Sequence, residues 1–119
     1  MKPIKNLDQR KQRYMLDAIP VRLGGIAANL ARVKSFSQHD DNSDAVFQLL
    51  DESKYYIEWT GRELDTEMIV RLIELQRQIA GWQYNWQSVW PDKDLRGKMI
   101  NETSKWSSMI IMSSGLLDQ

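Results

Sequence analysis

Apolar residues recur at alternating steps of three and four along four stretches of the chain, and no stretch alternates at step two. This spacing is typical of amphipathic helices, and it predicts helices over residues 8–36, 43–60, 65–89 and 91–114. Because the three connections between them are short, neighbouring helices are expected to be antiparallel. The pattern therefore predicts an all-α protein, with residues 1–119 forming a single domain built as an up-down-up-down antiparallel four-helix bundle.

The first stretch contains a proline, Pro20, inside its apolar series. The series consists of Leu16, Ile19, Leu23, Ile26, Leu30 and Val33. Proline removes a backbone donor and clashes with the preceding turn of a helix. Because the series keeps its phase across Pro20, we expect one helix with a kink near that residue. Gly24, Gly25 and Ala28 follow, and glycine inside a helix costs roughly 1 kcal/mol relative to alanine, so we expect another helix or a ligand to approach closely there.

The third stretch has the most regular pattern, with apolar side chains at steps 4, 3, 4, 3, 4 and 3. They are Met68, Leu72, Leu75, Ile79, Trp82, Trp86 and Val89. Such a heptad series is usual for helices that cross at about +20° in bundles. Asp65 is expected to cap the start of this helix, and Asn42 or Ser43 the start of the helix before it. Pro91 is expected in the first turn of the fourth helix, and Gly115 at its end.

The charged residues balance over the whole chain but not along it. Sixteen basic and sixteen acidic side chains cancel, so the overall charge gives no reason to expect a nucleic-acid partner. Residues 1–34 hold eight basic and two acidic side chains, whereas residues 35–67 hold two basic and nine acidic ones. Pairing of the first two helices would bring these opposite charges together. Alternatively, the basic N-terminal residues contact an acidic partner.

The composition excludes most kinds of metal or cofactor chemistry. There is no cysteine, so thiolate metal sites, Fe–S clusters and cysteine nucleophiles are excluded, and there is one histidine, His39, in a polar loop. Asp40, Asn42, Asp44 and Asp51 match four positions of a calcium-binding loop, but Ala45 occupies the position that requires glycine. No Glu-x-x-His motif for a di-iron centre is present. We therefore expect no metal and no cofactor.

The ends of the chain and its uncharged runs bear on its location. The first residues have no apolar stretch after their lysines, which argues against a secretory signal. The longest uncharged run has fourteen residues and is rich in Gln, Asn and Trp, whereas a membrane span needs about 20 largely apolar residues. The sequence thus predicts a cytoplasmic protein without a membrane partner.

Tryptophan is unusually frequent in this chain. The five residues are Trp59, Trp82, Trp86, Trp90 and Trp106. Tryptophan anchors protein interfaces, lines pockets for planar ligands and fills cores, because it brings a large contact area at low entropy cost. All three roles are open for these residues. The polar residues between Trp82 and Trp90 favour a role at the surface.

Taken together, these patterns lead to a functional hypothesis. No paired acid and base can be placed by spacing, and no phosphate-binding loop or nucleophile motif occurs, so an enzyme is not expected. Glu102 falls where its helix should be apolar, and we expect it to pair with a nearby cation. The leading hypothesis is a non-enzymatic interaction or adaptor protein that presents an aromatic face to a protein partner or, as a homodimer, to a second copy. The alternative is a carrier or sensor of a planar or apolar small molecule, which binds at the tryptophans or at Gly24, Gly25 and Ala28.

Overall fold

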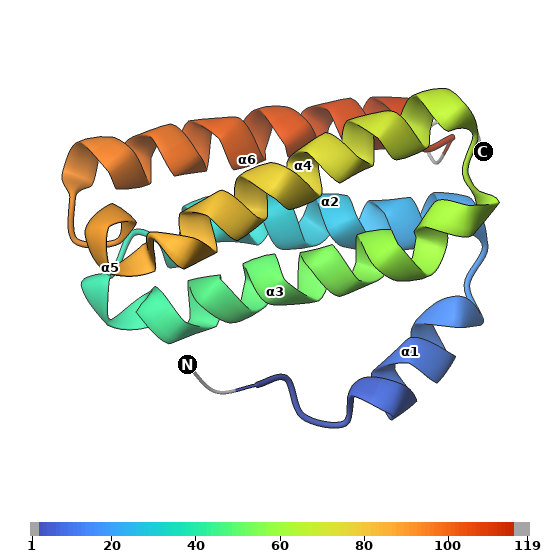
Figure 1. Ribbon diagram of the computed structural model, residues 1–119, viewed down its shortest axis with the longest axis horizontal. Coiled ribbons are helices and arrows are strands. Elements are labelled where there is room, and N and C mark those ends of the chain that lie inside the picture. Colours follow the sequence, from blue (N-terminus) through green and yellow to red (C-terminus); the bar gives the residue numbers. More distant parts are fainter. Residues whose placement is uncertain (1–2, 116–119) are drawn as a thin grey trace.

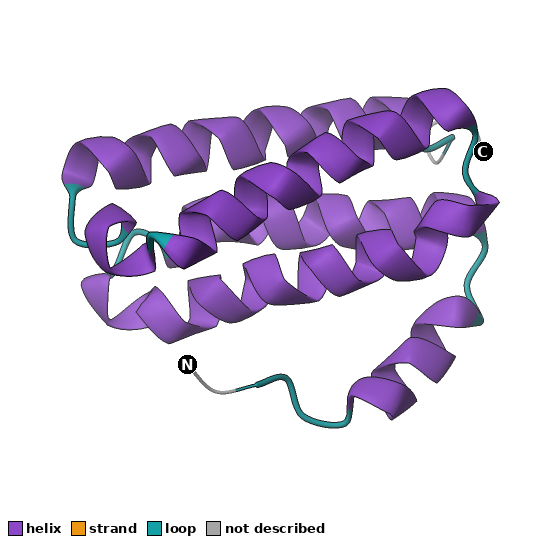
Figure 2. Ribbon diagram, in the orientation of Figure 1, coloured by secondary structure: helices purple, strands orange, loops and turns teal. Residues whose placement is uncertain are grey.

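The computed structural model describes residues 3–115, and every regular element in that range is helical (Figures 1 and 2). The α-helices are α1 (Leu7–Met15), α2 (Ile19–Phe36), α3 (Ser43–Thr60), α4 (Thr66–Tyr84), α5 (Trp86–Val89) and α6 (Lys93–Ser113). Two short 3-10 helices, η1 (Asp40–Asn42) and η2 (Gly61–Glu63), precede and follow α3. The predicted all-α class is confirmed.

The four long helices lie side by side and enclose the core. α2 packs on both α3 and α6, α3 also packs on α4, and the short helix α1 lies outside them against α3 (Figure 1). The core side chains come from all four long helices, and the completely buried ones include Ile26, Leu30, Leu50, Ile57, Leu72, Leu75, Ile79, Met99 and Ile110. No helix of residues 3–115 combines the length and the apolar character that crossing a membrane requires.

The prediction of one kinked helix near Pro20 is wrong, because the chain breaks into α1 and α2. The helix α1 ends at Met15, Ala18 has extended backbone, and Pro20 lies in the first turn of α2. Proline is well tolerated there, since that backbone nitrogen has no helical partner to lose. The guanidinium of Arg22 then donates to the carbonyls of Met15 (3.0 Å) and Asp17 (2.8 Å), so it satisfies acceptors that the end of α1 leaves open.

The predicted third helix, residues 65–89, is also interrupted. Asp65 caps α4 as expected, accepting from the Met68 amide at 2.8 Å, but α4 ends at Tyr84. Asn85 leaves the helical conformation, and its side chain donates to the carbonyl of Gly81 at 3.0 Å, which closes the end of α4. The chain resumes as α5 at a new angle. This break turns the last part of the predicted helix toward the end of the bundle.

The fourth helix begins two residues later than the predicted start at 91. α6 starts at Lys93, and the carboxylate of Asp92 accepts from the amides of Asp94 (2.9 Å) and Leu95 (3.0 Å). Pro91 therefore lies before the helix and not in its first turn. The side chain of Asp92 satisfies two amides that have no partner within the helix, so the helix begins after Asp92 and not at Pro91.

The opposite charges of residues 1–34 and 35–67 do meet within the fold. Arg10 of α1 pairs with Glu52 of α3, and Arg22 of α2 pairs with Glu63 of η2. The Asn29 amide also donates to Glu52, at 3.0 Å. The charge pattern allowed either pairing within the fold or contact with an acidic partner. Pairing within the fold accounts for two of the basic residues, Arg10 and Arg22.

Candidate functional site

Two of the five tryptophans are core residues at one end of the bundle. Trp86 and Trp90 of the α5 segment are only 4% and 7% exposed, and their rings stack with centroids 5.4 Å apart. Both indole nitrogens are satisfied internally: Trp86 donates to Ser43 Oγ at 2.9 Å, and Trp90 donates to the Asp40 carbonyl at 3.0 Å. These two rings therefore offer little surface to a partner or a ligand.

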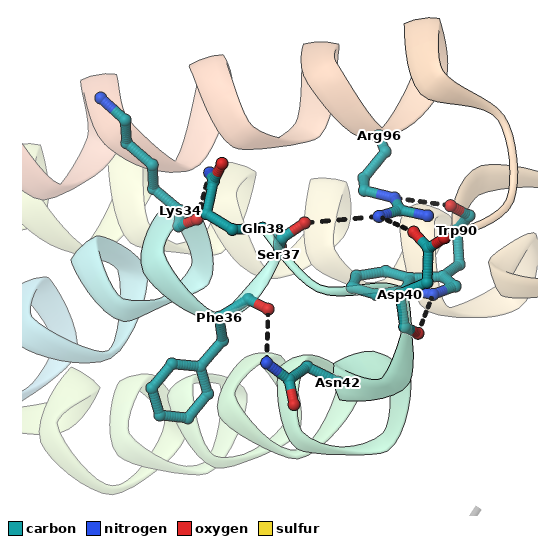
Figure 3. A network of polar contacts seen from close by, with 8 residues as sticks. All are labelled: Lys34, Phe36, Ser37, Gln38, Asp40, Asn42, Trp90 and Arg96. Atoms are coloured by element: carbon teal, nitrogen blue, oxygen red, sulfur yellow. Dashed lines mark hydrogen bonds and ion pairs between the residues drawn. The ribbon is translucent and has the colours of Figure 1, made fainter.

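An arginine holds Trp90 in place, as Figure 3 shows. The Arg96 guanidinium lies 4.0 Å from the centroid of the Trp90 ring, a cation–π contact. It donates to the Trp90 carbonyl (2.7 Å), the Asp40 carboxylate (2.9 Å) and, more weakly, the Ser37 carbonyl (3.3 Å). The network ties the start of α6 to the connection between α2 and α3. The hydrogen bonds of the Arg96 guanidinium all go to groups of this network, so Arg96 has a structural role here.

A second aromatic cluster forms where α1 lies on α3. Tyr14 stacks on Tyr56 with ring centroids 4.1 Å apart and an angle of 8° between the planes. Trp59 packs against both rings at 5.8 and 5.9 Å, and Tyr55 lies 5.7 Å from Trp59. The Tyr14 hydroxyl donates to the Arg22 carbonyl (3.0 Å) and forms a hydrogen bond with Thr60 Oγ1 (2.9 Å). Trp59 thus belongs to the surface that α1 covers.

Burial changes the acidity of the two stacked tyrosines. Loss of hydration raises the pKa of Tyr14 well above its usual range, although the hydrogen bond with Thr60 works in the opposite direction. Burial, together with the negative charge of Glu52, raises the pKa of Tyr56 to about 12. Both hydroxyls therefore stay protonated at neutral pH. Neither is suited to act as a base there.

A cleft opens beside this cluster, between α1 and α3. Its volume is about 500 Å³. The lining residues are Asn6, Gln9, Arg10, Arg13, Tyr14, Asp17, Glu52 and Tyr56. Arg10 and Glu52, which form an ion pair, line both this cleft and a neighbouring one of about 370 Å³. The larger cleft has an aromatic wall and a charged rim with residues of both signs, so it suits a small planar molecule that carries a polar group.

The remaining two tryptophans are half-buried and lie apart from the other three. Trp106 of α6 donates from its indole nitrogen to Gln78 Oε1 of α4 at 2.9 Å. With Met109 it lines a shallow groove of about 370 Å³ between these helices. Trp82 packs against the hydrophobic core from α4. The structure therefore distributes the tryptophans over separate places and does not gather them into one aromatic face.

The small residues of α2 have different neighbours. A methyl group at Gly25 would lie in ordinary contact with Tyr14 and Tyr56, 3.8 Å from each ring. Gly24 and Ala28 are half-buried. The helix α6 contacts the adjacent Ala27, whose carbonyl accepts a hydrogen bond from the Ser107 hydroxyl at 2.7 Å. Packing within the bundle thus accounts for part of this small-residue segment.

The sequence interpretation missed an apolar surface on α4. Three large side chains point away from the core: Val70 is 61% exposed, Ile73 is 53% exposed and Tyr84 is 90% exposed. We define the outer face of α4 as the exposed residues Val70, Ile73, Arg77, Ala80, Gly81 and Tyr84. Residues 70, 73, 77, 80 and 84 follow one another at steps 3, 4, 3 and 4, the spacing of a helix-pairing surface. This second series was visible in the sequence beside the inner one.

The middle of the outer face is charged. The guanidinium of Arg77 donates to both carboxylate oxygens of Glu74, with distances of 2.8 to 3.0 Å. These hydrogen bonds lower the pKa of Glu74, so the pair stays ionised at neutral pH. Near the end of the face, a methyl group added at Gly81 would have no neighbour within 4 Å among residues 3–115. Packing among these residues gives no reason for glycine there, although glycine costs about 1 kcal/mol relative to alanine in a helix.

His39 and Glu102 are the residues that the sequence singled out when catalysis and metal binding were considered. His39 is exposed in its loop, and Glu102 pairs with Lys105 at 3.8 Å on one turn of α6. Within residues 3–115, no three His, Cys, Asp or Glu side chains lie close enough together to hold a metal ion. The position of Glu102 agrees with the expectation that a nearby cation neutralises it.

Comparisons with known proteins give this chain no relatives. No family model, no curated protein and no solved structure matches it.

Proposed function

We propose that this protein is a non-enzymatic interaction protein that binds a protein partner, or a second copy of itself, through the outer face of α4. The observation that carries the proposal is the exposure of Val70, Ile73 and Tyr84 at helix-pairing steps. Apolar side chains that are more than half exposed and aligned along one helix are typical of surfaces that another helix covers. The inner series of the same helix, Leu72, Leu75 and Ile79, is completely buried.

The aromatic residue that we propose for the interface is Tyr84 and not one of the tryptophans. Trp86 and Trp90 are anchors inside the bundle, and Trp59 lies under α1. Tyr84 takes the place at the surface that the tryptophans were expected to hold. It is 90% exposed, and a tyrosine brings a large contact area and a hydroxyl to an interface.

For the arrangement that presents this face, we propose an up-down-up-down antiparallel bundle of α2, α3, α4 and α6, with α1 added outside. The connections support this arrangement, because only residues 37–42 separate α2 from α3 and only residues 61–65 separate α3 from α4. The packing of α2 on both α3 and α6 also agrees with it. A cytoplasmic location is part of the same proposal, and the absence of cysteine is compatible with it.

Affinity capture with matched variants tests the proposed surface. The chain is immobilised as wild type, as the double variant Val70→Glu/Ile73→Glu, and as the control Val21→Glu. Val21 is 45% exposed and lies on α2, outside the outer face of α4, so the control introduces one glutamate at another exposed apolar position. We expect wild type and control to retain the same partner, or added free chain, and the double variant to lose it. Retention that is the same for all three, with helix content preserved, would refute the proposal.

A small-molecule function is a second candidate, and the cleft between α1 and α3 favours it. Its volume of about 500 Å³ and its Tyr14–Tyr56 wall suit a planar ligand. Titration with planar aromatic carboxylates tests it, because Trp59 packs against these tyrosines and its fluorescence should change on binding. We expect Tyr56→Ala to abolish a saturable change and Trp106→Phe to preserve it. A response that survives Tyr56→Ala would show that the ligand binds elsewhere.

A further inference from the structure

We infer that the partner on the outer face of α4 is a second copy of this chain, packed antiparallel about a two-fold axis that crosses α4 between Glu74 and Arg77. The inference rests on the proposed function and names its partner. A two-fold axis pairs a surface with itself, so each group on the face must find its complement on the same face. The outer face of α4 meets this requirement in its charges and in its side-chain sizes.

The charges of the face are self-complementary. Glu74 and Arg77 lie on adjacent turns at its centre, with 42% and 77% of their side chains exposed. An axis between them brings Glu74 of one copy beside Arg77 of the other, and the reverse pair forms at the same time. The chain carries a net charge of zero, so no overall repulsion opposes the approach of two copies.

The side-chain sizes are complementary about the same axis. Val70 and Gly81 lie equally far from its crossing point, on opposite sides, so Val70 of one copy faces Gly81 of the other. Gly81 has open space where a methyl group would stand, and Ala80 beside it is also small and exposed. Glycine lets two helices approach closely, which gives Gly81 the packing role that it lacks inside the single chain.

Sedimentation of charge-reversed variants is the decisive experiment. Wild type should show a concentration-dependent dimer; because one helix pair makes a small interface, we expect micromolar or weaker affinity. Glu74→Arg and Arg77→Glu should each be monomeric alone, since like charges then meet twice across the axis. An equimolar mixture of the two should form a heterodimer, because both cross-axis pairs become attractive. Variants that associate equally well alone and mixed would overturn the inference.

Two glycines provide a matched control for the size argument. Gly97 of α6 also has no neighbour within 4 Å of an added methyl group, but it lies away from the outer face of α4. We expect Gly81→Leu to weaken association at least tenfold and Gly97→Leu to leave it unchanged. Circular dichroism of both variants reports whether they are folded. Equal association of the two variants would refute close packing at Gly81.

The orientation can be tested because the chain has no cysteine of its own. Under mild oxidation, a mixture of Val70→Cys and Gly81→Cys should yield a disulfide-linked heterodimer, and Val70→Cys alone should not link to itself. Self-linking of Val70→Cys would instead indicate parallel helices and overturn the antiparallel arrangement.

The outcomes separate this inference from the proposed function. A wild type that stays monomeric at all concentrations overturns the second-copy inference, while the capture experiment still decides whether another protein binds the face. A dimer that persists in Val70→Glu/Ile73→Glu forms through another surface and overturns the inference, and the capture experiment again decides whether another protein binds the outer face of α4.

Discussion

The outward faces of α3 and α4 differ in what covers them. On α3, the ring of Tyr56 is covered by α1, through the Tyr14 stack at 4.1 Å and the ion pair between Arg10 and Glu52. On α4, Val70 and Ile73 remain more than half exposed beside the Glu74–Arg77 pair. Both faces combine apolar side chains with a charged pair. This chain therefore covers one outward face with its own short helix and leaves a face of similar chemistry exposed.

The largest expected effect comes from uncovering α3. Tyr14→Ala removes a buried ring, its stack on Tyr56 and its hydrogen bond with Thr60. Truncation of a buried aromatic side chain typically costs about 3 kcal/mol or more of unfolding free energy. Urea unfolding followed by circular dichroism measures the loss, and hydrogen exchange shows whether α1 detaches first. A loss below about 1 kcal/mol would mean that α1 covers α3 only loosely.

A smaller effect is expected at alkaline pH. The pKa values of Tyr14 and Tyr56 are raised in the folded chain, the latter to about 12, so the folded state binds these protons more tightly than the unfolded state does. The resulting stabilisation is complete below pH 10, the usual tyrosine pKa, and is lost as the pH rises from there toward 12. Unfolding midpoints across this range measure it. The control Tyr14→Phe should lose less stability over the same interval, and an equal loss would contradict this account.

The open face should respond differently to substitution. Gly81→Ala is expected to raise the unfolding free energy of the monomer by up to about 1 kcal/mol, because alanine is the better helix former and the added methyl group meets no neighbour. Thermal unfolding at low protein concentration tests this, with Gly97→Ala as the matched control, which should gain a similar amount. Destabilisation by Gly81→Ala alone would show that position 81 is constrained within the monomer.

The smallest effect is expected for Ile73→Ala. An apolar side chain that is 53% exposed contributes little to the monomer, so the unfolding free energy should change by no more than about 0.5 kcal/mol. The same substitution should still weaken association through the outer face of α4. Chemical unfolding at low concentration and sedimentation at high concentration separate the two quantities. A large loss of monomer stability would mean that Ile73 belongs to the core.

Periodicity predicted which residues of α4 face the core, but it did not predict where Trp86 and Trp90 lie. Leu72, Leu75 and Ile79 are buried as their spacing predicts, because the steps along a helix decide which side chains share a face. Spacing also placed Trp86 near the end of one continuous helix over residues 65–89, whereas Asn85 breaks that helix and the rings of Trp86 and Trp90 are buried at the end of the bundle. Their partners, Ser43 and Asp40, lie more than forty residues away in the chain.

The break near Pro20 and the exposed face of α4 both depend on contacts between separate segments of the chain. A proline fits both a kink and the first turn of a new helix, and here Arg22 favours the second by binding the carbonyls that end α1 and by pairing with Glu63. The heptad spacing of Val70, Ile73, Ala80 and Tyr84 was readable in the sequence. The sequence interpretation did not use this spacing, and the structure showed that α1 covers α3 while these residues of α4 stay exposed.

Local residue patterns were enough to predict the helical class, the capping of α4 by Asp65 and the core-facing sides of α2 and α4, because these depend on residues within a few turns of one another. The three-dimensional fold was needed to see which aromatic rings are buried, where α1 lies and which apolar face stays exposed. Those outcomes depend on contacts between distant segments, such as Tyr14 with Thr60 and Trp90 with Asp40, and local spacing carries no information about such partners.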